Sequence, residues 1–105
     1  MSRPIDLAEV KRVFAEEGVP LRAKGRARAW ARRRPVVLFP ANRDQFPLFW
    51  VCVYGRHQAE GDLGLVMVDE GHEMVRIRNV VVAFDPKGDA VGRVRTAIEQ
   101  LRVQE

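Results

Sequence analysis

The sequence predicts an α+β fold in which an N-terminal helix and a C-terminal helix pack on a small, mainly antiparallel sheet of three to five strands. Apolar residues recur at helical spacing near both ends of the chain. Between them lie three short apolar runs, rich in β-branched and aromatic residues and bounded by Pro, Gly or Asp. Since 105 residues can bury one core, we expect residues 1–105 to form a single domain with two-layer packing.

The first helix is expected over residues 6–17. Asp6 and Glu9 have the spacing of a capping box, and the apolar residues that follow fall on one face: Leu7, Val10, Val13 and Phe14. Gly18 occupies the position at which a left-handed residue ends a helix, and Pro20 prevents continuation.

The three apolar runs are expected to be strands: Val36–Phe39, Leu48–Tyr54 and Val80–Phe84. Leu65–Val68 is a fourth candidate, joined by a turn at residues 69–73 to a strand over Met74–Phe84. The C-terminal helix follows, with Asp89 as its expected cap and apolar residues at helical spacing: Val91, Val94, Ile98 and Leu101.

The three runs are apolar on both faces, so a sheet made from them needs cover on both sides. Either the two helices lie on opposite faces, or the second face meets another subunit. We therefore expect a homo-oligomer, in its simplest form a homodimer.

The most unusual segment lies between Leu21 and Pro35, where thirteen residues include seven cations and no acid. As a strand, it places its alternating cations on one face and small residues on the other. As a helix, residues 26–34 form an Ala- and Arg-rich segment that Pro35 stops. We favour a strand at the sheet edge, where cations discourage edge-to-edge pairing.

This basic segment divides the molecule electrostatically. Residues 1–43 contain eleven cations against four acids, and residues 44–105 contain seven against ten, for a net charge of +4. Such a field attracts nucleic acid or an acidic protein. Most of the cations are arginine, which a GC-rich genome also favours, although a guanidinium binds phosphate whatever its origin.

The candidate nucleic-acid- or anion-binding residues are the basic segment and two cations of the expected last strand: Arg22, Lys24, Arg26, Arg28, Trp30, Arg32, Arg76 and Arg78. The cations would contact phosphates, and Trp30 would stack on an unpaired base. No motif for sequence readout accompanies them, so the expected binding is non-specific. The alternative is a solvated edge strand without a nucleic-acid ligand.

The sequence offers no catalytic constellation and no metal signature. His57 and His72 each lie among acids in a loop, but their spacing matches no known ligand pattern. Cys52 lies inside an apolar run, where a thiol is usually a small core residue. Ser2 and Thr96 are the only aliphatic hydroxyls, which cannot assemble a serine triad. We expect no catalytic residue, no metal and no cofactor.

No apolar run approaches the roughly 18–20 residues that a membrane helix needs, and the N-terminus has no apolar signal-peptide core. The expected location is the cytoplasm, with no membrane partner. The sequence therefore predicts a small, soluble, non-enzymatic domain for self-association or protein interaction. The alternative is non-specific nucleic-acid binding through residues 22–34, and a more distant one is a small enzyme or an anionic-ligand-binding domain with an anion site at Arg76 and Arg78.

Overall fold

The computed structural model describes residues 4–23, 36–45, 48–54 and 71–103. Within them the expected α+β fold is confirmed, with a helix near each end of the chain and an antiparallel sheet between them. The elements, in chain order, are α1 (Leu7–Glu16), β1 (Leu21–Ala23), β2 (Val36–Pro40), the short helix η1 (Arg43–Gln45), β3 (Phe49–Val53), β4 (Glu73–Ile77), β5 (Val80–Phe84) and α3 (Val91–Val103).

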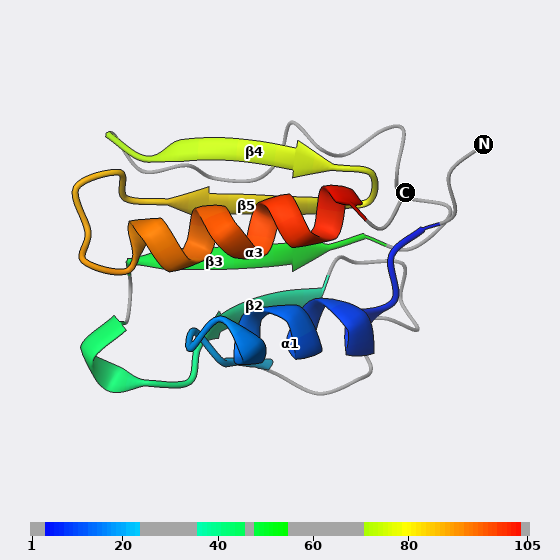
Figure 1. Ribbon diagram of the computed structural model, residues 1–105, viewed down its shortest axis with the longest axis horizontal. Helices are drawn as coiled ribbons and strands as arrows, with labels where there is room; N and C mark the ends of the chain where they lie inside the picture. Colours follow the sequence, from blue (N-terminus) through cyan, green and yellow to red (C-terminus); the bar gives the residue numbers. More distant parts are fainter. Residues whose placement is uncertain (1–3, 24–35, 46–47, 55–70, 104–105) are drawn as a thin grey trace.

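The strands form one antiparallel sheet in the order β1-β2-β3-β5-β4. Both helices lie in front of the same sheet face, α1 beside β2 and α3 across β5 and β3 (Figure 1). The two-layer arrangement is therefore confirmed for the described residues, and the helices do not lie on opposite faces. No helix among the described residues is long and apolar enough to cross a membrane.

The core fills the space between the helices and the sheet. Buried side chains come from α1, from alternate positions of β2, β3 and β5, and from α3: among them are Val10, Phe14, Leu38, Phe49, Val51, Val82, Val94, Ile98 and Leu101. Phe14 stacks on Phe49 with the ring centroids 6.1 Å apart. The helical periodicity predicted these contacts because it placed one apolar stripe on each helix.

The C-terminal end of α1 forms as expected. Gly18 has a φ of +77°, its N–H donates to Ala15 O at 3.1 Å, and the N–H of Val19 donates to Phe14 O at 3.0 Å. These two hydrogen bonds define a Schellman motif. At the other end the expected capping box is wrong, because the Asp6 side chain makes no capping hydrogen bond and the nearby Glu9 carboxylate pairs with Arg12.

The expected single strand over Met74–Phe84 is also wrong, because residues 78 and 79 form a tight turn between β4 and β5. Arg78 is there at a φ of +51°, a conformation that few residues other than Gly, Asn or Asp adopt. The side chain of Asn79 explains why the turn forms at this point. Its Oδ1 accepts the Ile5 N–H at 2.6 Å, and its Nδ2 donates to Ile5 O at 3.0 Å and to Tyr54 O at 2.8 Å.

Two further expectations concern the cap of α3 and the basic segment. The helix α3 begins at Val91, so the residue before it is Ala90 and the expected cap Asp89 lies one residue too early. Of the basic segment only Arg22 and Ala23 are described, and they belong to the edge strand β1. The rest of residues 22–34 and the candidate strand Leu65–Val68 lie outside the described residues.

Candidate functional site: the outer sheet face

The sheet face opposite the two helices, here called the outer face, is built by strand alternation. In β2, Leu38 points into the helix-side core, so its neighbours Val37 and Phe39 belong to the outer face. By the same alternation Trp50 in β3 and Arg76 in β4 also belong to it.

One row of the outer face crosses all five strands. Arg22 pairs with Phe39, Trp50 pairs with Ala83, and Ala83 pairs with Met74. One further step of the β2–β3 register places Phe39 beside Trp50. Since neighbouring strands lie about 4.8 Å apart, the row is about 19 Å long. It begins with a cation, continues with two aromatic rings and ends with a thioether.

A second row runs beside the first, from Val37 through Cys52 and Val81 to Arg76. Its middle forms a small apolar cluster in which Cys52 and Val81 are 4% and 1% exposed. Burial raises the pKa of the Cys52 thiol to about 11, so the thiol is protonated at neutral pH. Cys52 is thus a packing residue, as the sequence indicates, and does not provide a nucleophile.

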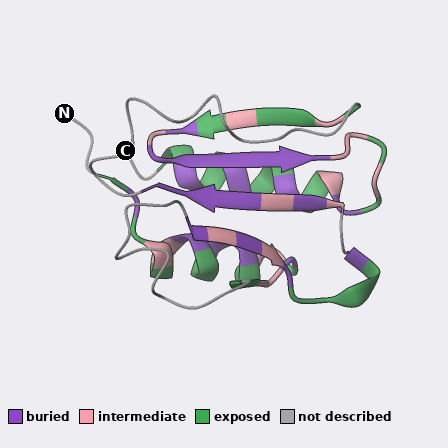
Figure 2. Ribbon diagram, turned by 180° about the vertical axis from the view of Figure 1, so that it is seen from behind, coloured by how far each residue is buried: buried purple, intermediate pink, exposed green. Residues whose placement is uncertain are grey.

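The margins of the outer face are accessible. Arg22, Met74 and Arg76 are exposed, while Phe39 and Trp50 are half-buried. Figure 2 looks onto this face and shows exposed residues along β4 beside the fully buried β5.

Trp50 has a second aromatic neighbour. The half-buried ring of His72, just before β4, lies 5.1 Å from the Trp50 ring, centroid to centroid, with 41° between the planes. The contact restricts the Trp50 side chain, so its ring is held in place on the outer face.

Charge is segregated between the two faces of the sheet. Among the residues of the five described strands, Arg22 and Arg76 are the charged residues of the outer face, and Glu73 lies on the helix side, 3.5 Å from Arg95. Asp85, which follows β5, accepts the Lys87 N–H at 2.9 Å. The strands therefore contribute cations and no carboxylate to the outer face.

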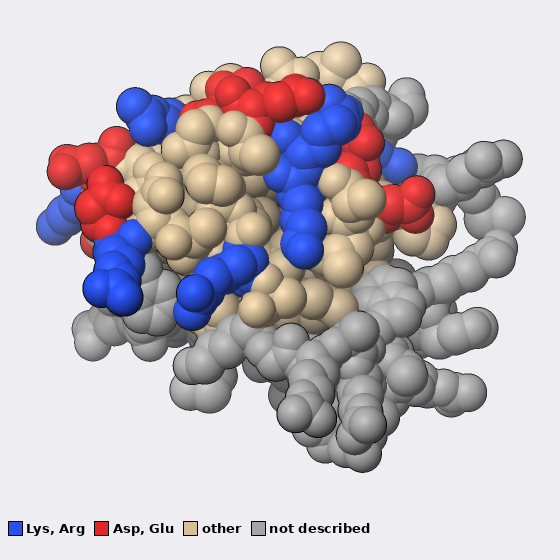
Figure 3. Space-filling model, turned by 90° about the horizontal axis from the view of Figure 1, so that it is seen from below, with Lys and Arg blue, Asp and Glu red and all other residues tan. Residues whose placement is uncertain are grey.

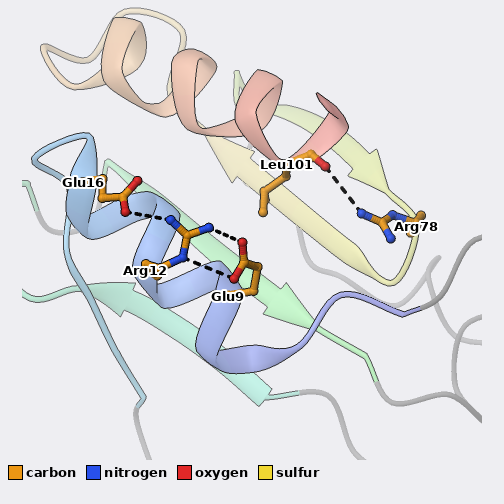
Figure 4. A network of polar contacts seen from close by, with 5 residues as sticks. All are labelled: Glu9, Arg12, Glu16, Arg78 and Leu101. Atoms are coloured by element: carbon orange, nitrogen blue, oxygen red, sulfur yellow. Dashed lines mark hydrogen bonds and ion pairs between the residues drawn. The ribbon is translucent and has the colours of Figure 1, made fainter. Parts of the chain in front are cut away.

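The helix layer has mixed charges instead. Arg12 lies between Glu9 and Glu16, with its Nη1 2.7 Å from the Glu16 carboxylate (Figure 4). The hydrogen bonds that Arg12 donates to the carboxylates of Glu9 and Glu16 raise the pKa of its guanidinium. Figure 3, seen from the α1 side, shows acidic and basic side chains next to one another. Such exposed pairs contribute little stability, and they leave this side without a field of one sign.

The predicted cations are only partly brought together. Arg22 and Arg76 lie on the outer face at opposite edges of the sheet. Arg78 is half-buried and does not join them, because its Nη2 lies 3.5 Å from Leu101 O at the end of α3 (Figure 4). The remaining predicted site residues, like His57, lie outside the described part of the chain: Lys24, Arg26, Arg28, Trp30 and Arg32.

The sequence did not indicate Phe39, Trp50 and Met74 as surface residues. Each lies in or beside an apolar run, where a core position is the ordinary expectation. The signal that identifies them is the alternation within each strand, and it becomes informative only when the helix-covered face is known.

Neither a cluster of His, Cys, Asp or Glu metal ligands among the described residues nor a known relative indicates a function. Among the described residues, no three His, Cys, Asp or Glu side chains lie close enough to hold a metal ion. No family model, curated protein or solved structure matches the chain.

Proposed function

We propose that this protein is a non-enzymatic association domain that binds another macromolecule through the outer face of its sheet. The observation that supports this proposal is the position of both helices on the other face, while aromatic, thioether and guanidinium groups on the outer face keep exposed surface. A domain that needed this face only for its own core would be expected to bury its aromatic and thioether groups more completely.

Self-association is the first form of this function, as the sequence predicts. Burying the remaining apolar surface of Phe39, Trp50 and Met74 in a second copy would contribute roughly 25 cal/mol per Å². Met74 is 49% exposed on the edge strand β4, so a second copy that covers the outer face would bury it.

Size exclusion coupled to light scattering tests self-association. The wild type at micromolar concentration should contain more than one chain, and Met74→Glu should shift it towards the monomer because a buried carboxylate is costly. Val103→Glu is the matched control, since Val103 is 79% exposed at the end of α3. A monomer at millimolar concentration, or equal effects of both variants, would contradict self-association through this face.

Non-specific nucleic-acid binding is the second form, and a separate observation favours it. The described strands give the outer face two arginines and no carboxylate, while the helix layer mixes both signs. Protein purified at low salt should then show excess absorbance at 260 nm relative to 280 nm. The excess should fall in the double variant Arg22→Gln/Arg76→Gln and persist in the equally charged control Lys11→Gln/Arg93→Gln, whose sites lie on exposed helix surfaces.

A further inference from the structure

Three side chains that can bind a soft cation lie together at the β4 margin of the outer face: the imidazole of His72, the thioether of Met74 and the indole of Trp50. We propose that these groups bind one monovalent copper ion, Cu⁺, with His72 and Met74 as its ligands and the Trp50 ring against its open side. The inference goes beyond the proposed association function and does not depend on it.

The spacing of His72 and Met74 places both donors on the outer face. Glu73 lies between them in the sequence, and its carboxylate is on the helix side, 3.5 Å from Arg95. Because side chains alternate along an extended chain, His72 and Met74 share the opposite side, and the ring contact of His72 with Trp50 agrees with this placement. Residues two apart on a strand are separated by about 6.8 Å at Cα, so a ring nitrogen and a thioether sulfur can both reach an ion between them.

The indole of Trp50 reaches the same place from β3. Strand β5 lies between β3 and β4, so the backbones of β3 and β4 are about 9.6 Å apart. The ring centroids of Trp50 and His72 are nevertheless only 5.1 Å apart, so the indole extends across β5. It crosses above Ala83, which pairs with Trp50 on one side and with Met74 on the other. This crossing accounts for the burial of Ala83 and brings the indole next to Met74.

The site lies at the margin of the sheet, where solvent reaches it. Met74 is 49% exposed, and the rings of His72 and Trp50 are half-buried. Within the described part of the chain, no hydrogen bond or ion pair involves the His72 ring or the Met74 sulfur. Both donors therefore have lone pairs for an ion that arrives from solution.

The donor set favours Cu⁺ over divalent ions. A thioether is a soft ligand that suits Cu⁺, and imidazole also binds copper, whereas Mg²⁺ and Ca²⁺ take oxygen ligands. A closed zinc site needs four ligands, and no three His, Cys, Asp or Glu side chains lie together among the described residues. The face of an indole attracts a cation within about 6 Å of the ring centroid. A soft cation with few ligands is the ion that these three groups fit.

Cys52 is not part of this site. It lies two residues beyond Trp50 on β3 and pairs with Val81, so it is on the opposite side of Trp50 from His72. A thiol is nevertheless a strong ligand for soft cations whenever the chain opens. The parent protein for the tests is therefore Cys52→Ala.

Equilibrium dialysis against Ag⁺, an air-stable soft monovalent cation, tests the site in a chloride-free buffer. The parent should bind one Ag⁺ per chain at micromolar concentration, and an excess of Zn²⁺ or Mg²⁺ should not displace it. Met74→Leu keeps an apolar side chain, and His72→Phe keeps a ring beside Trp50, so each removes a donor atom with little change of shape. Each should weaken binding by at least about 10-fold, the loss that is typical even for residues that only support a metal ligand. Acetonitrile-stabilised Cu⁺, measured without oxygen, should give the same order of affinities.

Fluorescence tests the indole. The chain has two tryptophans, so in the parent with Trp30→Phe the indole emission comes from Trp50. Ag⁺ should quench this emission, and adding His72→Phe should remove the quenching at the same concentration of Ag⁺. In dialysis, Trp50→Leu should weaken binding by about 2- to 30-fold, as the loss of a cation–π contact predicts.

Met67→Leu is the matched control, because it removes a thioether that the proposed site does not use. It should bind Ag⁺ like the parent, and thermal unfolding without metal shows whether each variant is folded. Binding that His72→Phe and Met74→Leu leave unchanged, binding that Met67→Leu abolishes, or ready displacement of Ag⁺ by Zn²⁺ would overturn the proposed site. No bound Ag⁺ at micromolar concentration would also overturn it and would identify the three side chains as packing contacts, without bearing on the association function.

Discussion

The side chain of Asn79 should contribute more to stability than any other polar group of the described turns. Asn79 is 2% exposed, and its amide makes three hydrogen bonds to main-chain atoms of Ile5 and Tyr54. These atoms belong to the segment before α1 and to the residue after β3, so one amide joins two distant parts of the chain to the β4–β5 turn. Replacing Asn79 with Ala would leave three buried main-chain groups without this partner.

The expected cost follows from those three groups. Each net hydrogen bond contributes about 1 kcal/mol, and a buried group without a partner costs about 1–3 kcal/mol, so Asn79→Ala should cost about 3–4 kcal/mol after partial relaxation. Domains of this size are stable by about 5–15 kcal/mol, so the variant should remain folded but be easily denatured. Asn79→Asp keeps the acceptor and replaces the donor with a second oxygen facing two carbonyls, so it should cost at least as much.

Urea unfolding followed by far-ultraviolet circular dichroism measures this cost. The midpoint of Asn79→Ala should fall by about 2 M at an m-value of about 1–3 kcal/mol per M. Asn42→Ala is the control, because Asn42 is exposed and its amide donates only a long 3.4 Å hydrogen bond to Gln45. A loss below about 1 kcal/mol for Asn79→Ala, or one equal to that of the control, would refute this account of the turn.

Two further predictions concern other elements. Gly18→Ala should destabilise the protein by about 1 kcal/mol or more, because φ is +77° and the new Cβ would lie 3.4 Å from Arg93 Nη1. Gly92→Ala in α3, where nothing lies within 4 Å of the new Cβ, should be neutral or stabilising. Urea unfolding of both variants checks this difference. The Cys52 thiol, whose pKa burial raises to about 11, should react slowly with a thiol reagent at pH 8 and rapidly in denaturant. Prompt labelling of the native protein at pH 8 would contradict this burial. Because the unfolded chain loses the thiol proton at a lower pH than the folded chain, the thiol's contribution to stability should fall as the pH rises from about 8.5 towards 11.

The fold could be predicted because its signals are local. The stripe over Leu7–Phe14, the glycine at position 18 and the run Val80–Phe84 each determine an element through neighbours in sequence, and each appears at the expected place. The expected caps at Asp6 and Asp89 did not form as predicted. A side chain with capping chemistry is necessary for such a bond, but the chain direction before the helix decides whether the bond is made.

The candidate site could not be predicted in the same way because it depends on non-local pairing. The hairpin turn at Arg78 and Asn79 has no glycine, and its stabilising partners, Ile5 and Tyr54, are 74 and 25 residues away from Asn79. Within the run from Met74 to Phe84, Asn79 is a residue type that favours turns, but one such residue does not distinguish one long strand from two short ones. Without that turn the strand order is unknown, and so is the face to which each arginine belongs.

The turn at Asn79 also determines the charge of the outer face. The two-residue turn pairs Ile77 with Val80, and from this register Arg76 pairs with Val81 on the outer face while Glu73 pairs with Phe84 on the helix side. A slip of one residue in β4 would exchange the two sets, because side chains alternate along a strand. It would place the Glu73 carboxylate on the outer face and turn Arg76 towards α3, against the exposed Arg95 that now pairs with Glu73. The same buried amide that joins the N-terminal segment to the sheet therefore keeps the Glu73 carboxylate off the outer face, so the stability of the fold and the charge that β4 contributes to that face depend on one register.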